Sequence, residues 1–482
     1  KVPCDVLHID PMWLKDRKSW PADACHFEWN EKDFGKADEF FAGLRRNGFR
    51  VSLWENPYVP EGTAAFREAA KRGFLVRSKK GGYAKANSNS HAVPLDFTNP
   101  EAALWWREKH RPLIEAGAAA FKTDYGEGIS KNAVFHDGTD GARTHSLYPM
   151  LYNRAVFQET EERTGRGFVW GRAGFAGSQR YPLVWTGDAQ VSWAGLAGSI
   201  RACLSLGLSG FGFVSHDIGG FGGKPGVELY LRWAQAGLFS SHTRFHGTTP
   251  REPWAFGPRA LRIVRELARI RYRFLPYIYS SAHDAEGGAA PLMRPLVLAY
   301  PADPLSYHPA ADTEWLLGSD ILVAPFVEPG GARDVVVPPG AWRDFWTGEI
   351  VFGPGVFRAR HGIEHFPMYV RSDTVIPLAP IRDSIRDGAF PELTWRVDVD
   401  RRASVVFRDD DNTEIFIEAQ KRGEKIVAFS ALRWRAADAK TFRFETADGR
   451  ALEVSRLDGA AERVGAKAIR AEGPFVAELD VG

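Results

Sequence analysis

Three charged residues stand within six positions of the segment AFKTDYGEGIS (residues 120–130): Lys122, Asp124 and Glu127. The segment begins as an apolar strand, stops at the acid, and continues through glycine into a polar loop over residues 130–145. Strand ends of this kind often carry the chemistry of α/β proteins, because a rigid scaffold holds the loop residues in place. We therefore predict a catalytic carboxylate at Asp124.

A second acid, Asp188, ends the apolar run PLVWTGD (residues 182–188). Two carboxylates on nearby strand ends fit a retaining glycosidase, in which one attacks the anomeric carbon and the other donates a proton to the leaving oxygen. That mechanism requires the carboxyl groups to lie about 5–5.5 Å apart, which nearby strand ends can provide. The two acids are therefore candidate catalytic residues.

A metal-dependent hydrolase is the alternative interpretation of the same strand ends. Its ligands would be His8, Asp10, Asp217, His242 and His246. The Trp and Arg residues between these positions do not suit a hydrated metal. The segment GGFGGKPG (residues 219–226) lacks the Ser or Thr of a phosphate loop, so it predicts a turn before a helix that starts at Pro225. We therefore predict no metal and no other cofactor.

Apolar runs that end in polar or aromatic residues recur along the chain, and helical patterns separate most of them. The seven runs span residues 5–10, 49–56, 117–124, 167–172, 182–188, 210–217 and 239–247. The helical patterns span residues 37–48, 62–73, 100–117 and 152–165. This alternation predicts parallel βα units, and we expect a (β/α)8 TIM barrel over residues 1–285 whose first strand is missing. The strand ends would then meet at one rim, where active sites of such barrels lie.

Short β-type runs separated by Pro and Gly turns follow the linker EGGAAP (residues 286–291). They include MRPLVLAY (residues 293–300) and continue to the C-terminus. We expect two all-β sandwich domains here, a proximal one over residues 286–380 and a distal one over residues 381–482.

The composition limits the partners. Lys and Arg total 62, Asp and Glu total 60, and the net charge is +2, so nothing favours a nucleic acid or a membrane surface. Three cysteines are too few for a disulfide framework and favour a reducing cytoplasm. Aromatic residues make up 13% of the chain, with 16 Trp, and Trp faces pack well on sugar rings. Large protein cores use Trp as well, so composition leaves two equal interpretations, an oligosaccharide or glycoside partner and an aromatic core; a homo-oligomer also stays open.

Several motifs in this order resemble glycoside hydrolase family 31, the retaining α-glucosidases and α-xylosidases, and most closely its bacterial α-xylosidase branch. The motifs are NPYVPEG, DFTNPEA, FKTDYGEGI, WTGD, GLSGFGFVSHDIGGF and SSHTRFHG. The resemblance runs from residue 1 to about residue 375 and is weaker beyond. It implies an α-glycosidase on a barrel, without a cofactor.

The resemblance implies roles for individual residues. Asp124 falls where the family has its nucleophile, and Asp188 where it has its acid/base. The residues that fall on sugar-binding positions are Asp10, Trp54, Lys122, Arg172 and His246. Motif letters also match at Glu127, Trp185, Asp217 and His242. Glu127 and Asp217 could equally brace loops, and Trp185 and His242 could each be wall or core residues.

The chain departs from the α-xylosidase branch at Pro11 and Met12, where those relatives tend to carry Cys-Phe beside the substrate. Met12 is therefore a candidate substrate contact, and an α-glucoside, an α-galactoside or a modified sugar stays open beside an α-xyloside. A transglycosylase would share every residue, whereas a silent sugar-binding protein would lack one of the carboxylates. The chain opens on a strand at Lys1, so we also expect a longer natural polypeptide, and the family resemblance implies an N-terminal β-sandwich domain upstream.

Overall fold

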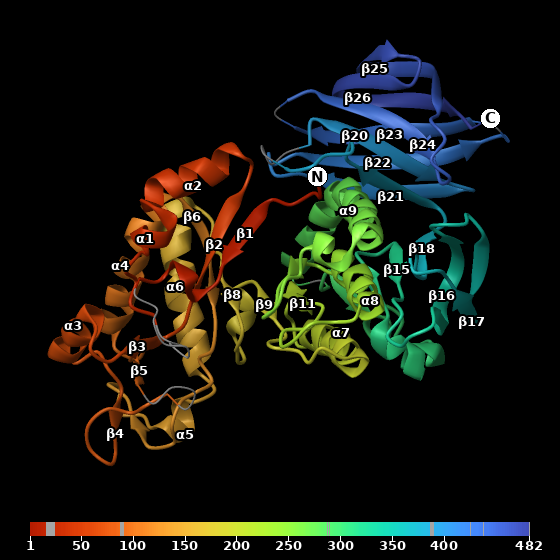
Figure 1. Ribbon diagram of the computed structural model, residues 1–482. Helices are drawn as coiled ribbons and strands as arrows, with labels where there is room; N and C mark the ends of the chain where they lie inside the picture. The colour runs from red at the N-terminus through yellow and green to blue at the C-terminus, as the bar shows by residue number, and fades with distance from the viewer. Residues whose placement is uncertain are drawn as a thin grey trace. The chain divides into compact units, whose positions relative to one another are not determined.

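The computed structural model describes residues 1–15, 25–86, 91–286, 288, 290–385, 390–424, 426–436 and 438–481 (Figure 1). Within the linker predicted at residues 286–291, positions 287 and 289 lie outside the described residues. The chain divides into two compact units. The N-terminal unit is Cys4–Trp185, and the C-terminal unit is Thr186–Gly482 with Lys1–Pro3.

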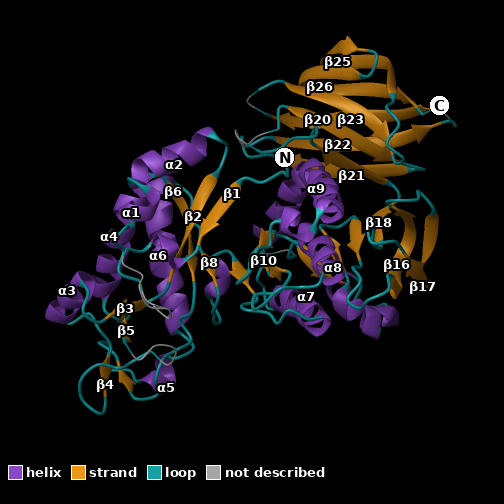
Figure 2. Ribbon diagram, viewed as in Figure 1, coloured by secondary structure: helices purple, strands orange, loops and turns teal. Residues whose placement is uncertain are grey.

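Five parallel strands form the sheet of the N-terminal unit, in chain order. They are β1 (Val6–Ile9), β2 (Arg50–Glu55), β6 (Ala118–Thr123), β8 (Trp170–Gly171) and β9 (Val184–Trp185). Helices α2 (Ala37–Arg46), α4 (Pro100–Ala116) and α6 (Tyr148–Thr164) gather on one side of this sheet (Figure 2). The strands and helices predicted in this part of the chain are therefore confirmed.

Helix α4 shows why these segments fold as the sequence pattern predicts. Asn99 caps it by accepting a hydrogen bond from the Glu101 amide, and Pro100 occupies the first turn, where no amide donor is needed. Its buried residues recur at helical spacing: Ala102, Trp105, Trp106, His110 and Leu113. The helix ends at Gly117, whose φ of 126° favours glycine.

The polar segment over residues 130–145 is more ordered than the sequence predicts. It contains β7 (Ala133–Val134), which pairs with β4 (Arg77–Ser78), and the short helix α5 (Gly141–Thr144). The remaining short elements of the N-terminal unit are η1 (Pro11–Trp13), α1 (Glu31–Phe34), β3 (Tyr58–Pro60), α3 (Ala64–Arg72), β5 (Ala92–Pro94) and η2 (Ser178–Arg180). The prediction of a plain loop is wrong, because strand pairing with a distant segment orders it.

The C-terminal unit begins with further strand–helix pairs. Its first strands are β10 (Val214–Ser215), β11 (Asp217–Ile218) and β12 (Arg244–Phe245), and β11 pairs in parallel with β12. Its helices are α7 (Trp193–Leu208), α8 (Val227–Leu238) and α9 (Pro258–Glu286), with η3 (Pro253–Phe256) before the last. Helix α8 starts at Val227 rather than at Pro225, with Gly226 as its N-cap residue.

Two mainly antiparallel sheets complete the C-terminal unit. The first has the order β13 (Met293–Pro295), β14 (Trp315–Leu317), β15 (Ile321–Val323), β18 (Met368–Arg371), β16 (Ala332–Asp344) and β17 (Ile350–Arg360). The second has the order β19 (Thr374–Leu378), β20 (Glu392–Asp398), β24 (Lys440–Thr446), β26 (Ala468–Asp480), β23 (Ile426–Arg435), β22 (Glu414–Arg422) and β21 (Arg402–Arg408), and β25 (Glu453–Gly465) pairs with β26. The chain thus passes from one sheet to the other between Arg371 and Thr374.

Part of the run MRPLVLAY is not a strand. After β13 it turns into α10 (Leu296–Ala299), and the 3-10 turns η4 (Pro304–Tyr307) and η5 (Pro309–Thr313) follow. Its prediction as continuous β structure is wrong, because apolar residues alone do not separate a short strand from a buried helical turn.

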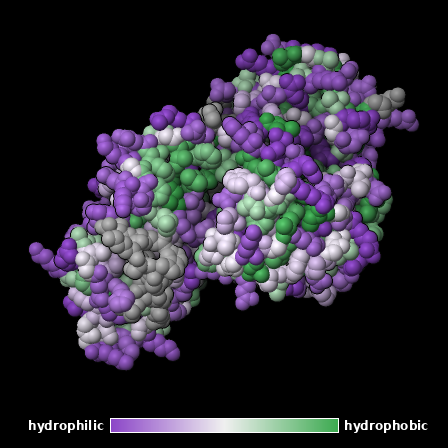
Figure 3. Space-filling model, in the orientation of Figure 1, coloured by the Kyte–Doolittle hydropathy of each residue, from purple (hydrophilic) through white to green (hydrophobic). Residues whose placement is uncertain are grey.

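Exposed apolar residues on one surface and the lengths of the helices complete the description of the fold. Hydrophobic residues gather over β1, where Val6 and Leu7 are exposed (Figure 3). Across the described ranges, every helix is too short or too polar to cross a membrane.

Candidate active site

Asp124 is the first residue after β6 and continues the ladder between β2 and β6. Its amide donates to the Glu55 carbonyl over 2.9 Å. One carboxylate oxygen, Oδ1, accepts from the Tyr125 amide at 2.8 Å and from Arg172 Nη1 at 3.1 Å. The other, Oδ2, accepts from Trp54 Nε1 at 2.8 Å. These donors fix the plane of the carboxylate.

Lys122 lies beside this carboxylate in a buried position. Its Nζ is 3.7 Å from Asp124 Oδ2 and 3.7 Å from Asp10 Oδ1, and it stands 4.6 Å from the centre of the Trp185 ring. His8 Nε2 is 2.9 Å from the same oxygen of Asp10. The ends of β1, β2, β6 and β9 thus bring four of the predicted site residues to Asp124: Asp10, Trp54, Lys122 and Trp185.

Arg172 is held by two carboxylates and one ring. Its guanidinium reaches Asp124 through Nη1 and Glu127 through Nη2, and it lies 4.5 Å over the Tyr125 ring. Tyr125 has a φ of 57°, which turns the chain sharply after Asp124. Glu127 therefore forms an ion pair with Arg172, and the bracing of the loop by Glu127 stays a prediction.

Two buried residues that the sequence did not single out hold this loop and the strand ends. The Tyr58 hydroxyl accepts from the amides of Gly126 and Gly128, and burial together with the Glu127 charge raises its pKa to about 12. Asn153 accepts from the Thr123 hydroxyl at 2.7 Å and donates to the carbonyl after Arg172 at 3.0 Å. Tyr58 lies in the motif NPYVPEG, but Asn153 carries no signal in the sequence.

Met12 projects to the surface beside this cluster. It lies in η1, directly after Asp10, and is 59% exposed, whereas its neighbour Trp13 is buried and donates to the Trp54 carbonyl at 2.8 Å. Met12 is therefore available to a bound molecule, while Trp13 anchors the turn that carries it.

In the C-terminal unit, Asp188 lies exposed on the segment before α7. Two backbone hydrogen bonds fix this segment, from Thr186 to the Ser215 carbonyl at 3.1 Å and from Phe221 to the Ala189 carbonyl at 2.8 Å. Gly220 has a φ of 74°, and a Cβ there would lie 2.9 Å from the Val191 Cα. Only glycine fits this close approach, so the loop over residues 217–223 sets the position of the Asp188 segment.

Asp217 and His246 lie on the two paired strands of the same unit or directly after them. Asp217 is fully buried, and its Oδ1 accepts from the Arg244 guanidinium, with 3.0 Å to Nε. His246 lies 5.6 Å from the Phe221 ring. The Asp217–Arg244 pair ties β11 to β12 and so supports the strand end that carries His246.

His242 remains neutral at ordinary pH, because burial and the nearby Arg271 guanidinium lower its pKa to about 3. Its carbonyl accepts from the Ser240 hydroxyl at 2.7 Å. The Phe213 ring lies 6.1 Å from this imidazole, so His242 packs within the C-terminal unit.

Buried His216 predicts that the protein loses stability in mild acid. Its Nδ1 accepts from Trp233 Nε1 at 3.0 Å, and burial lowers its pKa to about 4. In the unfolded chain the imidazole binds a proton near pH 6.5. The contribution of neutral His216 to the free energy of unfolding is therefore complete above pH 6.5 and is lost progressively as the pH falls to about 4. The free energy of unfolding should fall on the order of 1 kcal/mol per pH unit. Urea titrations of His216→Asn, which keeps an acceptor, should show a shallower slope, and an unchanged slope would contradict this assignment.

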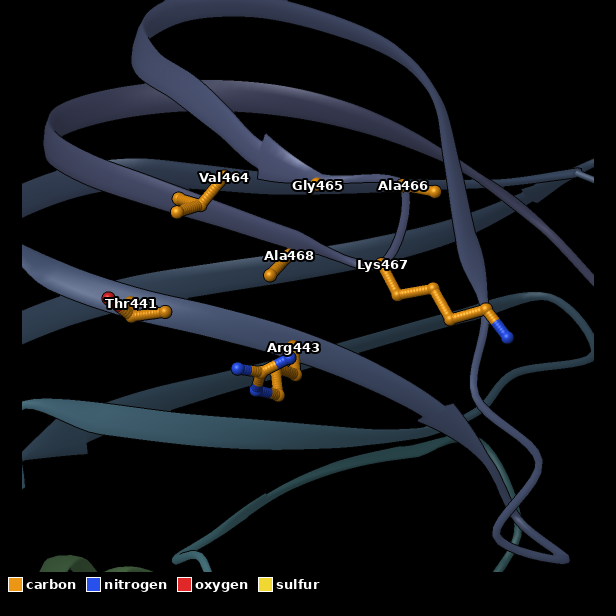
Figure 4. Close-up of a pocket in the computed structure, with 7 residues that line it drawn as sticks. All are labelled: Thr441, Arg443, Val464, Gly465, Ala466, Lys467 and Ala468. Atoms are coloured by element: carbon orange, nitrogen blue, oxygen red, sulfur yellow. The ribbon is translucent and has the colours of Figure 1, made fainter.

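Within the described ranges, no three His, Cys, Asp or Glu side chains group as metal ligands would. A pocket on the distal sheet is lined by Thr441, Arg443 and residues 464–468 (Figure 4). It contains no aromatic or acidic side chain, so it offers nothing for sugar stacking or acid catalysis.

Comparisons with known proteins place this geometry in a family. Residues 1–281 match the glycosyl hydrolases family 31 TIM-barrel domain, and residues 289–376 match the glycosyl hydrolase family 31 C-terminal domain. The chain belongs to glycoside hydrolase family 31. It therefore has a TIM-barrel domain of that family followed by the family's β domain.

Curated relatives and solved structures agree with the family. The chain is 33% identical to an α-xylosidase of Emericella nidulans, over 78% of this chain and 49% of that protein. It is 32% identical to an α-xylosidase of Lactiplantibacillus pentosus, over 96% of this chain and 61% of that protein. The chain thus spans about half to three fifths of these relatives.

Among solved structures, a soil-metagenome α-xylosidase complexed with xylose superposes with a TM-score of 0.71 at 26% identity, covering 77% of this chain and 59% of that one. A Flavobacterium johnsoniae dextranase complexed with glucose superposes with a TM-score of 0.86, covering 99% of this chain and 67% of that one. Because the sequences are only 23% identical, this likeness shows that the folds agree and says nothing about a shared substrate.

Proposed function

We propose that the protein is a retaining α-glycosidase that removes terminal α-linked xylose or glucose by double displacement. The observation that carries the proposal is the strand-end carboxylate of Asp124, oriented by Trp54 and Arg172 and flanked by Lys122. Membership of family 31 supports the same chemistry.

The first step forms a covalent intermediate. An Asp124 oxygen attacks the anomeric carbon, the glycosidic C–O bond breaks, and Asp188 gives its proton to the leaving oxygen. In the second step Asp188 takes a proton from water, whose oxygen attacks the anomeric carbon and releases Asp124. Two inversions at one carbon retain the α-configuration.

The sugar-binding roles follow from the groups that each residue presents. Lys122 and Arg172 donate to hydroxyl groups, whereas Asp10 accepts from them. Trp54 offers its ring to the sugar, the buried Trp185 lies 4.6 Å from Lys122 Nζ as a wall residue, and His246, directly after β12, completes the set. Asp217 acts through Arg244 rather than on the sugar, because its carboxylate is fully buried. Met12 contacts the part of the substrate nearest solvent.

Arg172 is expected to aid catalysis through its two-armed geometry as well as through its positive charge. Arg172→Lys keeps the charge but cannot reach Asp124 and Glu127 at once, so kcat/KM should fall about 100-fold. Glu127→Gln is the matched variant, because it keeps an acceptor for Arg172. Its kcat/KM should fall less than that of Arg172→Lys. Initial rates on an aryl α-glycoside measure both, and equal rates for Arg172→Lys and wild type would contradict the role.

Hydrolysis of p-nitrophenyl α-xyloside, α-glucoside and α-galactoside, with and without EDTA, tests the proposed function. We expect turnover of the xyloside or the glucoside that EDTA does not change. A loss of rate with EDTA would favour the metal-dependent alternative. Transfer of the sugar to an added saccharide in preference to water would identify a transglycosylase, and no turnover of any substrate would refute the proposal.

The domain boundaries and the cellular location are also proposed. We propose a (β/α)8 barrel over residues 1–285 and two β-sandwich domains over residues 286–380 and 381–482, supported by the two family matches and the two C-terminal sheets. A cytoplasmic location is supported by the three free cysteines, Cys4, Cys25 and Cys203.

A further inference from the structure

A buried acid and a buried histidine form a hydrogen-bonded pair next to the strand end that holds Asp124. Glu55 is the last residue of β2, His110 lies in α4, and neither side chain is exposed to solvent. Glu55 Oε2 and His110 Nε2 are 2.6 Å apart. The rings of Phe27 and Phe121 lie 4.9 and 4.6 Å from the imidazole, so the pair is enclosed by apolar groups.

The hydrogen bonds of His110 require a proton between the two side chains. His110 Nδ1 lies 2.8 Å from the Trp106 carbonyl, which can only accept, so Nδ1 carries a hydrogen. A bond between Nε2 and Glu55 therefore needs a second proton, located on one partner or the other. Burial opposes the charged imidazolium, but the charge and hydrogen bond of Glu55 outweigh it and raise the pKa of His110.

Other titratable groups face the pair from two further segments. Tyr152 and Glu159 face it from α6, and Cys25 faces it from the segment before α1. Burial, followed by the charge of Glu55, raises the pKa of both the Tyr152 hydroxyl and the Cys25 thiol. The Tyr152 hydroxyl and the Cys25 thiol are therefore neutral at ordinary pH, and Glu159 forms ion pairs with Arg107 and Arg163.

Glu55 belongs to the same strand end that holds Asp124 in place. The Glu55 carbonyl accepts from the Asp124 amide, and the adjacent Trp54 donates to Asp124 Oδ2. Because Glu55 is joined to α4 through His110, a shift of its side chain would move the end of β2 and both of these contacts. Reactions of this kind are sensitive to displacements of about 1 Å.

We propose that Glu55 and His110 are positioning residues, a proton-sharing buried pair that locks the end of β2 to α4 and thereby aims Asp124. The inference rests on the proposed function for its kinetic consequences. It assigns a role to two fully buried residues that the sequence did not single out.

The test uses four variants that separate positioning from stability. His110→Phe keeps an aromatic ring but leaves Glu55 unpaired, so its melting temperature and kcat should both fall. The double variant Glu55→Met/His110→Phe removes both polar groups, which should restore much of the melting temperature. Positioning predicts that kcat of the double variant stays about 100-fold low with KM changed little.

Two variants serve as controls. Glu55→Gln can donate from its amide to a neutral imidazole Nε2, so it should retain most of the wild-type kcat. Trp105→Phe removes a buried donor to Glu68 from the same helix, away from β2, and should lower the melting temperature without lowering kcat. A kcat loss in Trp105→Phe equal to that in His110→Phe would overturn the proposal.

Hydrogen–deuterium exchange gives a readout that does not depend on turnover. The peptide that contains Asp124 should exchange faster in the double variant than in wild type, because the Asp124 amide loses its fixed acceptor. Wild-type exchange and wild-type kcat in a double variant with restored melting would overturn the proposal. If wild-type protein turns over no glycoside, the proposed function fails, and the exchange rates still decide whether the pair positions Asp124.

Discussion

Asp124→Ala is expected to lower kcat on the order of 10⁵-fold, because the variant lacks the carboxylate that we propose attacks the anomeric carbon. Its side chain accepts from Trp54 and Arg172, so the alanine variant leaves donors without an acceptor at the site. Asp124→Asn is the matched variant, because it keeps the size of the side chain and one acceptor. Both should remain folded, which circular dichroism would check.

A trapping experiment identifies the nucleophile directly. Wild-type protein incubated with a 5-fluoroglycosyl fluoride should gain the mass of one sugar on the peptide that contains Asp124. The Asp124→Asn variant should gain none. A label on any other peptide would assign the nucleophile elsewhere.

Asp188→Ala is expected to produce the second-largest effect, and its size should depend on the leaving group. Proton donation contributes about 10²–10⁴-fold, so natural disaccharides should react slower by that factor. Aryl glycosides with acidic leaving groups need little protonation, and their first step should change far less. Because Asp188 is exposed, the free energy of unfolding should stay within about 0.5 kcal/mol of wild type.

Azide supplies the decisive control for Asp188. A small anion can enter the space left by the carboxylate and attack the covalent intermediate without general-base help. The product should be a glycosyl azide of α-configuration, which nuclear magnetic resonance identifies. Equal losses on activated and natural substrates, with no rescue by azide, would remove the acid/base role from Asp188.

The sequence by itself determined the elements whose signals are local. Strands β2 and β6 lie inside their predicted apolar runs, and α4 lies inside the predicted helical pattern over residues 100–117. The sequence also determined the family, because several ordered motifs agree and the family matches confirm them. Hydrophobic period, capping and turn residues act over a few positions, so they can be read without a tertiary structure.

Helices that are buried on most sides were predicted poorly: α7 was missed, and α8 was indicated only by its start, expected at Pro225 and observed at Val227. In α8 every residue from Leu229 to Leu238 is buried, and α7 is rich in small and apolar residues. Such helices have no polar face to reveal their period. The pairing of β4 with β7 was equally hidden, because it joins segments more than fifty residues apart.

The partners of the site residues were decided by the tertiary structure alone. Trp54 and Arg172 reach Asp124 from 70 and 48 positions away in the chain, and Glu55 meets His110 across 55 positions. Those contacts depend on strand register, including the irregularity between Val51 and Ser52 in the pairing of β2 with β6. Local patterns specify which face a side chain takes, whereas register and packing, summed over the whole unit, specify which groups face it.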